Sequence, residues 1–113
     1  MAQVTVLVVP GGYVAKLDGD VDIAVADRIE TEILRQTEAT AALIVDLATV
    51  SFLDSAGVRL IDRLVGRQEK GGALARIVAP QGSSTLFTLQ VCGFRPELLV
   101  ATRQAAMASV AQR

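Results

Sequence analysis

Hydrophobic and polar positions alternate along the chain with two periods, one typical of strands and one typical of helices. A Val-rich stretch at 3–9 predicts a first strand, and the Pro-Gly-Gly run at 10–12 predicts a hairpin turn. Residues 13–17 alternate like a returning strand, so we expect the sheet to begin with an antiparallel pair. Residues 18–20 are interpreted as a turn that leads to Asp22, a candidate helix cap.

Helical periodicity begins after that turn. Residues 23–39 carry apolar side chains along one stripe, which predicts an amphipathic helix. The apolar run at 41–47 suits a strand covered on both faces, and 48–53 is interpreted as a brief connection. A second helix is predicted from about residue 56 to residue 70, where two glycines at 71–72 end it.

The C-terminal third continues the alternation. Residues 74–78 predict a buried strand, parallel to the preceding one because a helix joins them. Ser83 is the expected cap of a short helix that ends near Cys92. Residues 98–101 predict a short strand, and Thr102 is the expected cap of a last helix.

Composition fits one globular domain over residues 1–113. About half of the side chains are hydrophobic (51%) and few are aromatic (4%), so we expect a core of small aliphatic residues. The predicted fold class is α/β. It has a mixed central sheet of about four or five strands, the first antiparallel, packed with about four helices.

Charge and residue types exclude several classes of function. With 11 basic and 12 acidic residues, the chain lacks the basic stripe that nucleic acid requires. It has no apolar run long enough for membrane insertion and no basic start of a signal peptide, so we expect a cytoplasmic protein. The absence of histidine excludes a Ser-His-Asp triad and histidine-ligated zinc. The lone Cys92 cannot form an internal disulfide and is predicted to be a small core residue.

The run Asp54-Ser55-Ala56-Gly57 is the candidate site. Ser55 is expected at or beside the start of the second helix, where free N–H groups favour a serine cap and a phosphate equally. Gly57 costs about 1 kcal/mol relative to Ala in a helix, which points to a partner or a phosphate that approaches the backbone. Local chemistry alone favours Ser55 as a simple cap, worth ~1 kcal/mol.

Residues 44–65 resemble the signature of STAS-domain anti-sigma factor antagonists: an apolar strand ending in Asp-Leu, then aromatic-apolar-Asp-Ser-x-Gly-apolar, then an amphipathic helix. The Gly-Asp-Val-Asp run at 19–22 is similar to the family's turn before its first helix. The glycines at 71–72 and the Cys-Gly-Phe run at 92–94 also fall in the expected order. The resemblance covers nearly the whole chain and implies a single STAS domain.

In that family an unphosphorylated antagonist binds an anti-sigma factor of the serine-protein kinase type and so frees a sigma factor. The resemblance implies that this kinase phosphorylates Ser55 and that a phosphatase resets the switch. It implies a binding protein rather than an enzyme, with no cofactor and no metal. The residues implied in partner binding are Asp22, Asp54, Ser55, Ala56, Gly57, Val58 and Arg59.

Several of these residues have simpler alternatives. Asp22 can serve only as a helix cap, and Asp54 can bond turn amides or orient Ser55 for the kinase. Asp46 is expected to bond nearby backbone N–H groups and is assigned no chemistry. Arg59 replaces a glycine that many family members carry. It either lies on a solvated helix face or alters partner choice, for instance by pairing with phosphate on Ser55.

Two other functions are alternatives to this switch. One is a STAS subunit without serine switching, such as an accessory component of a lipid-transport ATPase or a scaffold in a stress-signalling assembly. The other is an enzyme, for which the acidic pair of a phosphoaspartate receiver and a Walker-type loop are both missing. Weak nucleotide binding at the helix N-terminus and a homodimer both stay open at this point.

Overall fold

A mixed five-stranded sheet forms the centre of the fold in this computed structural model, which describes residues 2–111. Its strands, in spatial order, are β1 (Gln3–Val9), β2 (Gly12–Val21), β3 (Ala42–Leu53), β4 (Ala75–Val78) and β5 (Leu99–Val100). β1 runs antiparallel to β2, whereas the pairs from β2 to β5 are parallel. The predicted α/β class with an antiparallel first strand is confirmed.

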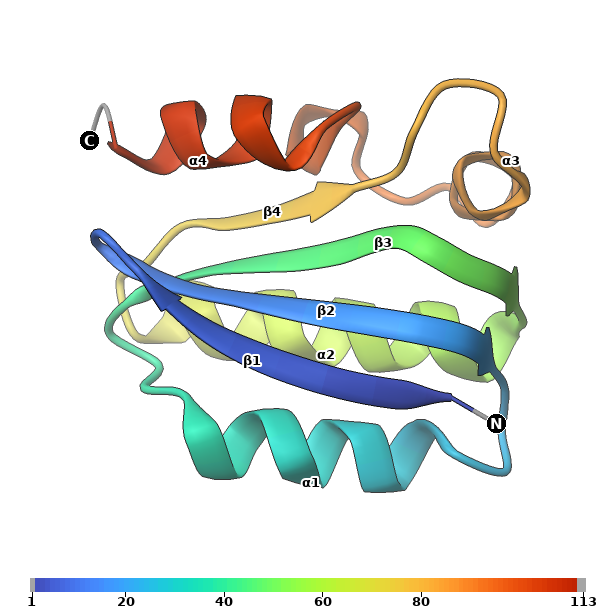
Figure 1. Cartoon of the computed structure of the whole chain (residues 1–113), viewed down its shortest axis with the longest axis horizontal. Coiled ribbons are helices and arrows are strands. Elements are labelled where there is room, and N and C mark those ends of the chain that lie inside the picture. The colour runs from blue at the N-terminus through green and yellow to red at the C-terminus, as the bar shows by residue number, and fades with distance from the viewer. Residues whose placement is uncertain (1, 112–113) are drawn as a thin grey trace.

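Helices cover both faces of this sheet (Figure 1). They are α1 (Ala26–Gln36), α2 (Ser55–Lys70), α3 (Ser84–Val91) and α4 (Arg103–Ala111), with a 3-10 turn η1 (Pro96–Leu98) before β5. Figure 1 shows α1 and α2 on one side of the sheet and α4 on the other, while α3 lies near the end of β3. The four predicted helices are therefore present among the described residues.

Successive residues of β3 belong alternately to two separate hydrophobic cores, one on each face of the sheet. Leu43 and Val45 face α1 and α2, in the larger core, whereas Ile44 points to the opposite face and packs with Ala106 of α4. Burying one such side chain contributes about 1.5–3 kcal/mol. Both cores are dominated by aliphatic side chains, in agreement with the composition.

The two central strands are longer than predicted. Residues 18–20 were expected to form a turn and 48–53 a connection, but they pair with each other as the ends of β2 and β3. The register shifts twice along this pair, between Lys16 and Asp18 and again between Gly19 and Asp20. Such bulges interrupt the two-residue alternation of a strand, so the sequence pattern did not reveal it.

Helix caps in the C-terminal third follow the sequence prediction. The Ser83 hydroxyl accepts a hydrogen bond from the N–H of Leu86 at 3.2 Å, and the Thr102 hydroxyl accepts one from the N–H of Ala105 at 3.1 Å. Cys92 does not follow its prediction, because it is exposed at the end of α3 rather than buried in the core. The short α3 buries Thr85, Leu86 and Leu89 and contacts β3, whereas Cys92 follows its last turn as the C-cap residue.

Candidate functional site

Asp54 organises the turn between β3 and α2. It is the N-cap residue of α2, and its Oδ1 accepts a hydrogen bond from the N–H of Gly57 at 3.0 Å. Its Oδ2 accepts a second bond from the N–H of Ile23 at 3.1 Å, while its own N–H donates to the carbonyl oxygen of Val21 at 3.2 Å. One carboxylate therefore joins the start of α2 to the loop that follows β2.

The Asp22 side chain forms its hydrogen bond within that loop and is not the N-cap of α1. Its Oδ1 accepts a hydrogen bond from the N–H of Ala24 at 3.0 Å, which is the pattern of an Asx turn. The N-cap residue of α1 is Val25, and α1 begins at Ala26, so the prediction of Asp22 as the helix cap is wrong. The loop still places Asp22 on the expected edge, because its neighbour Ile23 is bonded to Asp54.

Ser55 is exposed and is the first residue of α2. Because the Asp54 carboxylate already accepts the N–H of Gly57, the interpretation of Ser55 as the cap of this helix is wrong. The hydroxyl lies where the positive end of the helix dipole favours negative charge. Ser55 is thus a solvent-facing hydroxyl at a position that can accommodate a phosphate group.

Packing inside the domain explains why position 57 is glycine, which the sequence alone did not reveal. A Cβ at this position would lie 2.8 Å from the carbonyl oxygen of Val21 and 2.5 Å from the Cδ1 of Leu53. The first turn of α2 packs directly on the end of β2, and only glycine leaves the required space. Access for a partner or a phosphate is therefore not needed to explain this glycine.

The other expected partner-binding residues divide between core and surface. Ala56 and Val58 are 8% and 9% exposed and belong to the larger core, so they support the turn from beneath. Arg59 is exposed one turn after Ser55 on the same helix. Among the expected residues after Asp54, the side chains of Ser55 and Arg59 are those that reach solvent.

Two apolar residues at this edge were not anticipated. Ile23 is 76% exposed in the loop after β2, and Phe52 is 52% exposed near the end of β3. Each of these two side chains offers exposed apolar contact area at the surface. Phe52 has a sequence signal, since it is the aromatic position of the motif, two residues before Asp54, but the motif alone does not identify it as a contact residue.

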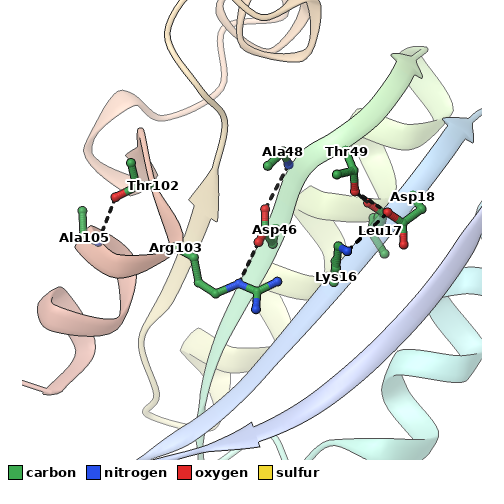
Figure 2. Close-up of polar contacts among 9 residues, drawn as sticks. All are labelled: Lys16, Leu17, Asp18, Asp46, Ala48, Thr49, Thr102, Arg103 and Ala105. Carbon is green, nitrogen blue, oxygen red and sulfur yellow. Dashed lines mark hydrogen bonds and ion pairs between the residues drawn. The ribbon is translucent and has the colours of Figure 1, made fainter.

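A second polar group lies on the sheet face that carries α4 (Figure 2). The nearly buried Asp46 accepts hydrogen bonds from the Nε of Arg103 and from the N–H of Ala48, both at 2.9 Å. The bond to a nearby N–H was expected, but the ion pair to α4 was not. Lys16 and Asp18 form a separate, exposed pair at 3.7 Å on this face.

Residues 2–111 contain no group of three or more side chains suited to holding a metal ion. Over the same range, no helix has the length and apolar character needed to cross a membrane.

Comparison with solved structures places this fold among known ones. An anti-sigma factor antagonist from Mycobacterium paratuberculosis is 23% identical, with a TM-score of 0.83 over 98% of this chain and 95% of that chain. The unphosphorylated form of the anti-sigma factor antagonist SpoIIAA is 22% identical, with a TM-score of 0.79 over 98% of each chain. The phosphorylated form of SpoIIAA from Bacillus is also 22% identical, with a TM-score of 0.67 over 97% of this chain and 99% of that one.

At these identities the likeness shows a shared fold. No curated protein sequence matches the chain significantly. The family model of the STAS domain, however, matches residues 3–106, which include every strand of the sheet and the whole of the Asp54–Gly57 turn. The chain belongs to the STAS domain family.

Proposed function

We propose that this protein is an anti-sigma factor antagonist whose binding to its partner is ended by phosphorylation of Ser55. One observation carries the proposal: Asp54 caps α2, so Ser55 is not needed as a cap and its side chain is exposed. Similar folds are described as anti-sigma factor antagonists, and one of them, SpoIIAA, is described in a phosphorylated form.

The surface around Ser55 suits such a switch. The exposed side chains of Ile23 and Phe52 offer apolar contact area at the same edge. A phosphate adds about −1.5 to −2 charges at neutral pH, next to the carboxylate of Asp54. A partner that buries the apolar side chains would then have to bury this charge as well, which is costly without a matching cation.

The same phosphate should change folding stability little. At the first position of α2 it meets the positive end of the helix dipole, which favours a negative group by typically 0.3–1 kcal/mol. This gain opposes the repulsion from Asp54 within the domain. The modification therefore acts on binding rather than on the fold.

The proposed partner is an anti-sigma factor of the serine-protein kinase type, which transfers phosphate to the Ser55 hydroxyl. A phosphatase returns the protein to its binding form, and a sigma factor is freed while the antagonist holds the kinase. In this scheme the chain acts as ligand and substrate. Arg59 is exposed one turn from Ser55, and we expect it to influence which kinase is bound.

Calorimetry with a purified anti-sigma factor of the serine-protein kinase type tests the proposal. Ser55→Ala should bind like the wild type, whereas Ser55→Asp should bind at least tenfold more weakly. Ser84→Asp is the matched control, because Ser84 is the exposed first residue of another helix, α3. Mass spectrometry after incubation with the kinase and ATP should find one phosphate, on Ser55. Wild-type affinity in Ser55→Asp would overturn the proposal.

A further inference from the structure

A hollow of about 660 Å³ lies along the C-terminal half of α2, and its lining residues are Ala39, Arg63, Gly66, Arg67, Lys70 and Gly71. An α-helix rises 1.5 Å per residue, so Gly66 lies about 16 Å along α2 from Ser55. The hollow is therefore a separate surface from the edge described above. It faces the loop that follows α1, through Ala39.

Within residues 2–111, no close contact explains the glycine at position 66. A Cβ added there would meet nothing within 4 Å, whereas one added at Gly57 or Gly71 would collide with a backbone oxygen. Glycine inside a helix costs about 1 kcal/mol relative to Ala. What Gly66 does provide is bare backbone in the lining of the hollow, where another chain can approach closely.

Three cations border this bare backbone at positions i, i+4 and i+7 of one helix face: Arg63, Arg67 and Lys70. Arg63 is already paired with Glu30 of α1, at 2.8 Å. Within residues 2–111, Arg67 and Lys70 form no ion pair with a carboxylate. The hollow thus carries uncompensated positive charge.

The Arg67 guanidinium is also held in place before any partner arrives. Its Nη1 donates to the Thr37 hydroxyl at 2.8 Å, and its Nη2 donates to the Thr37 carbonyl oxygen at 2.7 Å, at the C-terminus of α1. A fixed cation loses less side-chain entropy on binding than a mobile one. Arg67 is therefore suited to receive a carboxylate from another molecule.

We propose that this hollow binds an acidic helix of a partner protein, seated on Gly66 with its carboxylates facing Arg63, Arg67 and Lys70. Any α-helix with acidic residues at i, i+4 and i+7 reproduces the spacing of the three cations, which spans about 10 Å. A nucleic-acid strand fits less well, because the lining offers no aromatic side chain for base stacking. This inference does not depend on the function proposed for Ser55.

The test titrates the ¹⁵N-labelled chain with a synthetic Ala-rich helical peptide that carries Glu at i, i+4 and i+7. A second peptide has the same composition, with its Glu residues distributed around the helix. The patterned peptide should shift the amide signals of Gly66, Arg67 and Lys70 and bind at least fivefold more tightly than its isomer. Equal affinities, shifts confined to other surfaces, or no shifts at all would overturn the proposal.

Gly66→Ala separates binding from folding. This substitution should raise the melting temperature by a few degrees and weaken binding of the patterned peptide at least fivefold, so the loss cannot come from unfolding. Unchanged binding would overturn the proposal.

A test variant and its control each remove one positive charge. Lys70→Gln should weaken binding at least threefold, whereas Arg35→Gln, at an exposed cation of α1 outside the hollow, should leave it unchanged. Equal effects of the two would show attraction by net charge alone and overturn the proposal. Inorganic phosphate at constant ionic strength should not displace the peptide. Displacement at low millimolar phosphate would make the hollow a small-anion site and overturn the proposal as well.

Discussion

The carboxylate of Asp54 accepts a hydrogen bond at 3.1 Å from the backbone N–H of Ile23, which lies 31 positions earlier in the chain. The same carboxylate caps α2 through Gly57. Through this one side chain, the loop after β2 and the first turn of α2 are held as a unit. The position of the exposed Ser55 therefore depends on Asp54 rather than on its own hydroxyl.

Replacing Asp54 should loosen this unit. Asp54→Ala removes the acceptor of both N–H groups and should lower the free energy of unfolding by about 1–2 kcal/mol. Asp54→Asn retains a side-chain oxygen for the cap and should lose roughly half as much. Urea denaturation measures both values. Equal losses in the two variants would contradict the assignment of Asp54 as a hydrogen-bonded cap.

Two glycines of α2 should respond to alanine in opposite directions. Gly57→Ala forces a Cβ against the carbonyl oxygen of Val21 and should destabilise the fold by about 1–3 kcal/mol. Gly66→Ala meets open space and should stabilise it by about 1 kcal/mol. Thermal unfolding of the two variants, which carry the same chemical change in one helix, gives the comparison directly. Shifts of the same sign would contradict the described packing of the first turn.

Arg59 should interact with a phosphate on Ser55, because the two positions are four residues apart on α2. A nearby cation favours the doubly charged phosphate and so lowers its second pKa. Arg59→Gln should therefore raise that pKa, as followed by ³¹P NMR on the phosphorylated protein. Arg63→Gln is the control, since Arg63 lies two turns from Ser55 and pairs with Glu30. No change in Arg59→Gln would leave Arg59 as a solvated surface residue.

The Asp46–Arg103 pair should hold α4 on the sheet. Asp46 is 4% exposed, and Asp46→Ala would remove the partner of Arg103 and the acceptor of the Ala48 N–H. We expect a loss of about 1–3 kcal/mol and faster hydrogen exchange in α4 than in α2. Lys16→Ala, which removes an exposed pair, should cost less than about 1 kcal/mol. Uniform exchange in both helices would mean that α4 does not open separately.

Stability should vary little between pH 6 and 7.5. The chain has no histidine, the residue that usually titrates in this range. The hydrogen bond from Arg63 to Glu30 raises the pKa of Arg63 above its ordinary value. Because folding raises this pKa, Arg63 contributes its full stabilisation at any pH below the pKa that it has in the unfolded chain. That contribution is lost only in strongly alkaline solution. Urea unfolding across this range should change by less than about 0.5 kcal/mol.

Sequence periodicity located most elements because most of them obey a regular period. It failed at 18–20 and 48–53, where β2 and β3 pair through two register shifts. The Asp-Gly-Asp run has the composition of a turn, and Gly19 has a positive φ of 86°. The pairing that nevertheless keeps the run in the sheet involves residues about thirty positions away. Local propensity contains no information on such a distant partner.

In the candidate site, too, local sequence could not predict roles that depend on the folded structure. Asp and Ser are both good helix caps, so the sequence could not decide which of Asp54 and Ser55 performs that role. The extended backbone of Asp54, with φ −99° and ψ −176°, makes it the N-cap residue. Gly57 was attributed to an external ligand because its true neighbour, the carbonyl oxygen of Val21, comes from another strand.

α2 is fixed at both ends by glycines that touch backbone carbonyl groups. A Cβ on Gly57 would lie 2.8 Å from the oxygen of Val21, and one on Gly71 would lie 2.1 Å from the oxygen of Ala39. Sliding of the helix along its axis would disturb both contacts at once. This packing opposes an axial shift of α2, so the phosphate proposed on Ser55 should act on a partner through direct contact rather than through movement of the helix.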